Sequence, residues 1–164
     1  MLLALGGIPV ACSIVTDIAR GKVYNIAVVL ELVLLAAAVY ATGRYISIVY
    51  LLALLPFSMA LFSAGLGGGD CKLLLVASAL LSTLSLKAGV YMCMYFLALL
   101  HPAWCLHRKR KIGAISAVLA AIPLSKLALC AYPVLLAISA LNKRGVLAAP
   151  LIMLAYIVAA SSVA

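Results

Sequence analysis

Two aspartates are the residues of this chain whose type and placement could do chemistry. The chain holds only three acidic residues, and two of them, Asp17 and Asp70, stand at the ends of apolar stretches. Two carboxyl groups within hydrogen-bond reach cannot easily both be ionised, so such a pair shares a proton. One carboxylate can then activate a water molecule as general base while the protonated partner polarises a peptide carbonyl. The pair therefore predicts peptide hydrolysis that uses neither a metal ion nor a cofactor.

A run of glycines, Gly67, Gly68 and Gly69, directly precedes Asp70. A peptidase must bring an extended substrate backbone close to its acid pair, and glycines lack the Cβ atoms that would block it. Helix packing through small residues is the alternative explanation for the glycines. A phosphate-binding loop is not indicated, because Leu73 follows Lys72 where such a loop has Ser or Thr.

The elements that must position these residues are membrane helices. Of the 164 residues, 69% are hydrophobic and only 9% are charged, against roughly 25% charged residues in a soluble domain. The mean hydropathy of +1.34 also excludes a disordered chain, which needs low hydrophobicity. We expect one membrane-embedded domain over residues 1–164, an all-α polytopic bundle of helices.

We expect six membrane-spanning helices along the chain, where a crossing takes about 20 apolar residues and about 17 are tolerated. They are Leu2–Ile18, Val23–Ala41, Ile46–Ala64, Leu73–Leu86, Ala88–Leu106 and Val146–Val163. A glycine-rich break over residues 65–70 separates the third from the fourth. Two shorter apolar runs within residues 112–141 fit either a tilted hairpin that crosses the membrane or a re-entrant pair. No basic residue precedes the first apolar run, so we expect a retained span rather than a removable signal peptide.

The positive charges set the orientation of these spans. The net charge is +9, from twelve Lys and Arg residues against three acidic ones. Cytoplasmic loops carry an excess of Lys and Arg, which favours an N-terminus outside. Nine of the twelve then lie inside: Arg20, Lys22, Lys72, Arg108, Lys109, Arg110, Lys111, Lys143 and Arg144. Asp17 and Asp70 consequently meet at the cytoplasmic face, where the basic residues contact anionic lipid. Nucleic acid is not an expected partner, because no basic stripe with interleaved aromatic residues occurs.

The remaining residues that could do chemistry have plainer interpretations. The five cysteines form no C-x-x-C pair, which favours small buried apolar residues over a zinc site or a disulfide framework. Glu31 lies six residues past Asn25, about 9 Å along a helix, and a structural carboxyl is favoured over a substrate contact. His101 is expected to pack at a helix end rather than to act in catalysis.

Residues 67–73, G-G-G-D-C-K-L, resemble the G-x-G-D-x-K-L signature of the type IV prepilin peptidases and archaeal preflagellin peptidases. In that family the first aspartate is followed by Asn in the pattern D-x6-P-N, and here Asp17 and Asn25 match while Tyr24 replaces Pro. Residues 146–151, V-L-A-A-P-L, resemble the I-P-F-A-P-F opening of the family's last span and keep Pro150. Presenilin-like proteases share G-x-G-D, but their P-A-L motif near the C-terminus is absent here.

The resemblance implies that Asp17 and Asp70 are the catalytic pair, with Gly67, Gly68, Gly69, Lys72 and Asn25 supporting them or binding substrate. Asn25 is expected to form a hydrogen bond near the pair or to cap the second span. Lys72 lies about 200° around a helix from Asp70, so it is expected to reach lipid headgroups or the substrate.

The implied substrates are prepilin-like or preflagellin-like precursors, cut at the cytoplasmic membrane face between a short basic leader and a long apolar helix. Because the chain starts at its first span and lacks paired cysteines, we expect a peptidase without metal and without methylation of the new N-terminus. Two other functions stay open. One is a non-catalytic assembly factor that binds pilin-like helices. The other is a small transporter, which would need its carboxyl groups near the middle of the bilayer. The oligomeric state is not indicated.

Overall fold

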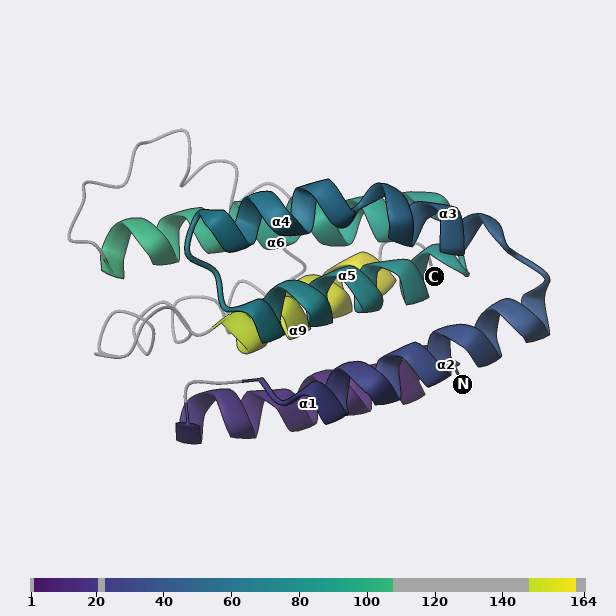
Figure 1. Ribbon diagram of the computed structural model, residues 1–164, viewed down its shortest axis with the longest axis horizontal. Coiled ribbons are helices and arrows are strands. Elements are labelled where there is room, and N and C mark those ends of the chain that lie inside the picture. Colours follow the sequence, from purple (N-terminus) through teal and green to yellow (C-terminus); the bar gives the residue numbers. More distant parts are fainter. Residues whose placement is uncertain (1, 21–22, 108–147, 162–164) are drawn as a thin grey trace.

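The computed structural model describes residues 2–20, 23–107 and 148–161, and this part of the chain is helical, without strands. The helices are α1 (Leu2–Arg20), α2 (Asn25–Thr42), α3 (Ile46–Ala53), α4 (Leu55–Ser63), α5 (Gly68–Ser82), α6 (Leu86–His107) and α9 (Ala148–Ser161). They lie side by side along one axis, as Figure 1 shows. The prediction of an all-α bundle is confirmed, whereas the apolar runs expected within residues 112–141 lie outside the described residues.

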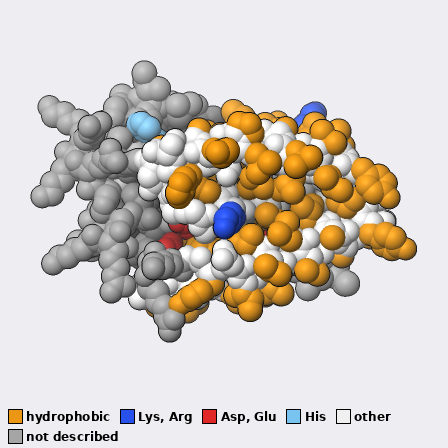
Figure 2. All heavy atoms as spheres, viewed as in Figure 1, with side chains coloured by type: hydrophobic (Ala, Val, Ile, Leu, Met, Phe, Trp, Pro, Cys, Tyr) orange, Lys and Arg blue, Asp and Glu red, His pale blue; other side chains and the backbone are white. Residues whose placement is uncertain are grey.

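Three helical stretches of the described chain are long and apolar enough to cross a membrane. They are Asn25–Thr42, Ile46–Ser63 and Leu86–Ala103. Their outer faces carry large exposed apolar side chains, among them Ile26, Val33, Met59 and Phe62. Figure 2 shows such side chains spread over much of one face of the molecule, as expected of a surface in contact with lipid. The chain is thus a membrane protein.

The prediction of six spans is wrong by this measure, because α1, α5 and α9 are not among these three stretches. α5 has 15 residues and α9 has 14, fewer than the roughly 17 that a crossing needs. Both are surrounded by protein: α5 packs against α2, α3, α4 and α6, and α9 packs against α1 and α6. Figure 1 shows them between the α1–α2 pair and the helices α3, α4 and α6. A helix enclosed by other helices does not need to match the thickness of the bilayer.

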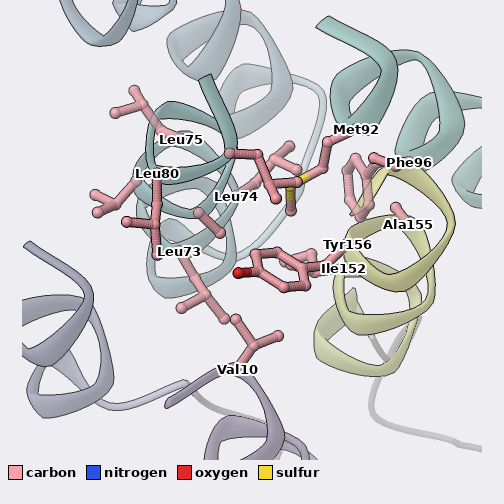
Figure 3. Packing of buried hydrophobic residues seen from close by; sticks show 14 of the residues in the cluster. Val10, Leu73, Leu74, Leu75, Leu80, Met92, Phe96, Ile152, Ala155 and Tyr156 are labelled. Carbon is pink, nitrogen blue, oxygen red and sulfur yellow. The ribbon is translucent and has the colours of Figure 1, made fainter. Parts of the chain in front are cut away.

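The hydrophobic core lies between α5 and α9. Every residue of α5 from Leu73 to Ser82 is buried, and most of α9 is buried as well. Figure 3 shows Leu73 and Leu74 of α5 close to Ile152 and Tyr156 of α9. The two short helices are therefore the most enclosed elements of the described chain. Packing in the core holds the first turn of each helix in place.

The third expected span is two helices, α3 and α4, which meet at Leu54. Pro56 stands at the start of α4 and causes this break. Its nitrogen has no hydrogen to donate to the carbonyl of Leu52, and its ring crowds that carbonyl.

The glycine-rich break is shorter than expected. α4 ends at Ser63, and α5 begins at Gly68 rather than at Leu73, so Asp70 belongs to its first turn. The chain reverses at Gly65, whose φ of 100° lies in the region that favours glycine. A carboxylate in the first turn of a helix is favoured by the free N–H groups there, which explains why the helix extends back past Asp70.

Candidate active site

Asp17 lies one turn before the end of α1, and its side chain is only 5% exposed. Its Oδ2 accepts a hydrogen bond of 3.1 Å from the backbone N–H of Ala149, and the N–H of Ala148 also stabilises the carboxylate. Ala148 and Ala149 are the first two residues of α9, where backbone N–H groups have no partner within the helix. The start of α9 thus holds the Asp17 carboxylate and favours its negative charge.

Asp70, the third residue of α5, is half-buried. Its Oδ1 is buried and has no hydrogen-bond partner. Its Oδ2 lies over Gly67, so close that a Cβ atom built on Gly67 would stand 2.5 Å from it. One oxygen of Asp70 therefore lies close to Gly67, and the other is left with an unused hydrogen-bonding site.

The two aspartates come together although they are far apart in the sequence. Their carboxyl groups are close enough for Asp17 to act electrostatically on Asp70. Figure 1 shows why: α1 ends where α5 and α9 begin, at one end of the bundle. Figure 2 shows a small area of acidic side chains on the surface, beside residues that are not described. The arrangement is a pair of carboxyl groups, one held by N–H donors and the other with an unpartnered oxygen.

The glycines before Asp70 have different surroundings. A Cβ on Gly69 would lie 2.6 Å from the backbone oxygen of Val23, in the segment that joins α1 to α2. A Cβ on Gly68 would meet only the ring of Phe62, at an ordinary 3.5 Å. Gly67 and Gly69 thus allow close approach of parts of the chain itself, to the Asp70 carboxylate and to the α1–α2 segment. The structure gives no such reason for Gly68.

The other expected site residues lie near the pair but do not join it. Asn25 is the first residue of α2 and is exposed, and no hydrogen bond links it to either aspartate within the described chain. The expected capping role is wrong, because Tyr24 occupies the N-cap position and its side chain forms no capping hydrogen bond. Lys72 is exposed on α5. Figure 2 shows isolated basic side chains among apolar ones.

Glu31 is apart from the pair and is fully buried, with neither carboxyl oxygen accepting a hydrogen bond. His101 is exposed near the end of α6. In the described ranges no three His, Cys, Asp or Glu side chains gather as a metal ion would require.

The first turn of α9 is the part of the site that sequence reasoning missed. Pro150 was a visible signal, because proline is favoured in the first turn of a helix and marks α9 as starting nearby. Nothing in the spacing of residues tells which side chain those free N–H groups face. The pairing of Asp17 with the Ala149 N–H depends on the tertiary structure, since the two residues are 132 positions apart in the sequence.

Compared with protein-family models, with curated proteins and with solved structures, the chain matches none. The fold and the site define its class: an all-α membrane protein with a carboxyl pair at one end of the bundle.

Proposed function

We propose that this protein is a membrane aspartyl endopeptidase that removes the short basic leader of prepilin-like or preflagellin-like precursors. The observation that carries the proposal is the meeting of Asp17 and Asp70 at one end of the bundle. The signature around Asp70 and the spacing of Asp17 from Asn25 support the same reaction and the same class of substrate.

The surroundings of each carboxyl group support a division of roles. Asp17 accepts N–H groups from α9, which stabilise its ionised form, so it acts as the general base. Asp70 carries the shared proton on its unpartnered Oδ1. A water molecule gives a proton to Asp17 as its oxygen bonds to the substrate's carbonyl carbon, while Asp70 gives its proton to the carbonyl oxygen. Asp17 then gives its proton to the leaving nitrogen, and the C–N bond breaks as Asp70 takes a proton back from a hydroxyl of the diol. The product is a carboxylic acid and an amine, and the pair again holds one proton.

The proposal places the site at the cytoplasmic face of the cell membrane, with the N-terminus outside. The excess of Lys and Arg in the loops on the side of Asp17 and Asp70 supports this orientation. The proposed topology has six crossings. Three are the helical stretches that are long and apolar enough to span a membrane on their own, and the other three are α1, α5 and α9. A precursor whose apolar helix lies in the bilayer would then present the peptide bond before that helix to the pair.

The test is cleavage of a precursor by the purified protein in lipid vesicles. Asp17→Asn and Asp70→Asn should each abolish cleavage while leaving membrane insertion and thermal unfolding unchanged, because each keeps the size of the side chain. Lys87→Ala is the matched control, since Lys87 is exposed at the start of α6, at the opposite end of the bundle. Cleavage that survives either Asn substitution would contradict the proposal. A precursor that is bound but never shortened by the wild type would favour a non-catalytic assembly factor.

A further inference from the structure

The carboxyl pair is enclosed, so a substrate reaches it only after part of the protein moves. Asp17 is 5% exposed, and Oδ1 of Asp70 is buried. A reacting peptide bond must come within about 3 Å of such groups, or within one water molecule of them. α1 is held here by the hydrogen bond from Ala149 of α9 to Asp17, and the segment before α2 packs directly on Gly69. The element that moves must therefore be one that is held more loosely at this end of the bundle.

α4 is such an element. Leu61 is its one buried residue, whereas the described part of α2 has six and α5 has eleven. Met59 and Phe62 of α4 are 70% and 61% exposed. The side-chain hydrogen bond of Ser63 stays within α4, and no side chain of α4 is bonded to another helix in the described chain. Few buried apolar contacts are typical of the elements of a protein that open locally.

α3, which continues into α4, is fixed to the bundle instead. The Tyr50 hydroxyl of α3 lies 3.7 Å from the sulfur of Cys93 in α6, within hydrogen-bond distance. The ring of Tyr50 also packs at Gly89 of α6, where a Cβ atom would stand 3.0 Å from it. The same Cβ atom would stand 2.7 Å from the backbone oxygen of Ser78 in α5, so α3, α5 and α6 are closely packed at this point. α3 can thus stay in place while α4 moves.

Both ends of α4 have the features of a hinge. Pro56 cannot donate to the carbonyl of Leu52, so one hydrogen bond is missing where α3 passes into α4. Helices bend most readily at such prolines. After α4 the chain reverses at Gly65, and glycine has the widest choice of backbone angles. Figure 1 shows α3 and α4 nearly in line, followed by the turn that leads to α5.

The last turn of α4 lies against the first turn of α5. A Cβ atom on Gly68 would meet the ring of Phe62 at 3.5 Å. Gly68 is the first residue of α5 and stands two residues before Asp70. Movement of α4 away from α5 therefore opens a path to Asp70 from the side on which α4 exposes its apolar face.

We propose that α4 is a gate, which swings about the break at Pro56 and admits the precursor to Asp17 and Asp70 from the bilayer. The proposal rests on the proposed peptidase function for its effect on cleavage. What enters is the extended segment of the precursor just before its apolar helix, because that helix lies in the bilayer beside the exposed face of α4. Hinged elements that close over a site and open for the substrate are common in enzymes.

Pro56→Ala tests the hinge. The new N–H can donate to the carbonyl of Leu52, and one more hydrogen bond favours the closed, continuous helix by about two- to tenfold. The kcat/KM for a precursor should fall by about the same factor, while the unfolding temperature stays the same or rises. A merely structural role of Pro56 would lower activity only together with stability. Pro102→Ala, the same change inside α6, is the matched control and should not slow cleavage. A Pro56→Ala enzyme as fast as the wild type would overturn the proposal.

Thiol labelling follows the gate directly and needs no precursor. Leu61→Cys places a thiol on the buried side of α4, and Val28→Cys places one at a buried position of α2 as the control. Each position lies within one turn of the helix end nearest the carboxyl pair. Labelling by a water-soluble maleimide is measured from the masses of peptides, which separates each site from the native cysteines.

Leu61→Cys should be labelled faster than Val28→Cys by about tenfold or more, because only α4 opens locally. Adding Pro56→Ala should slow labelling at position 61 by the factor by which it slows cleavage, and leave position 28 unchanged. Equal labelling of the two positions, or no effect of Pro56→Ala at position 61, would overturn the proposal. A wild type that cleaves no precursor would contradict the proposed function alone, and the labelling comparison would still decide whether α4 opens.

Discussion

Substitution of Gly67 by alanine separates catalysis from folding at this site. The new Cβ would stand 2.5 Å from Oδ2 of Asp70, and ordinary contact begins at 3.4 Å, so the oxygen must withdraw by about 0.9 Å. The atom that moves is the far end of a flexible side chain, and the Gly67 backbone, with φ −59° and ψ 139°, is open to alanine. Folding therefore loses little, on the order of 1 kcal/mol for a less favourable N-cap residue.

Activity should fall far more than stability, because the displaced atom belongs to a catalytic carboxyl group. A displacement of about 1 Å costs up to about a hundredfold in rate, which corresponds to roughly 2.7 kcal/mol in the barrier. The assay is the initial rate of precursor cleavage, measured beside thermal unfolding in detergent, for Gly67→Ala and for Gly68→Ala.

Gly68→Ala is the matched control for this prediction. Its Cβ would make only an ordinary contact with Phe62, so cleavage should stay within about twofold of the wild type, a difference below about 0.5 kcal/mol. If Gly68→Ala is as slow as Gly67→Ala, the reasoning is refuted, and passage of the substrate backbone over the whole glycine run becomes the better explanation. A Gly67→Ala enzyme with full activity would also refute it.

Three further predictions concern stability and pH. Gly69→Ala should lower the unfolding temperature, because its Cβ would stand 2.6 Å from the backbone oxygen of Val23, which cannot yield as a side chain can. Arg44→Ala should lower the free energy of unfolding by about 0.5–1.5 kcal/mol, because Arg44 donates hydrogen bonds to the carbonyls of Thr83 and Leu84. Cleavage should not slow, since these carbonyls lie at the end of α5 that is remote from the carboxyl pair. An unchanged unfolding curve would contradict this prediction. The rate of cleavage should fall at both low and high pH, because the pair works with one proton; a rate that rises steadily through neutral and high pH would exclude a shared proton.

Composition and spacing predicted the helical class and the positions of the helices well, because apolar length is written directly in the sequence. Asn25–Thr42 and Leu86–His107 lie within two residues of the expected spans at each end. Pro56 was a signal for the break at Leu54, because proline interrupts the hydrogen bonds of a helix. The residues on both sides of it are apolar, however, so the stretch was predicted to be one span.

Other features could not be predicted because they depend on which helices surround which. The short α5 and α9 are stable because other helices enclose them, and enclosure does not follow from the hydropathy of a segment. The pairing of Asp17 with Asp70 was predicted from topology. The donor from Ala149 was not, because a backbone N–H leaves no trace in the residue type. The two glycines with close neighbours, Gly67 and Gly69, are likewise distinguished from Gly68 only by packing.

The central claim is that Asp17 and Asp70 together cut a precursor, and the mass of a co-expressed precursor tests it most directly. The wild type and Asp70→Asn would each be expressed with prepilin-like precursors of the host, and the precursor mass measured afterwards. The account predicts loss of the leader with the wild type and an intact precursor with Asp70→Asn, with both proteins inserted in the membrane to the same extent. A leader that is removed equally by Asp70→Asn, or that the inserted wild type never removes, would contradict it.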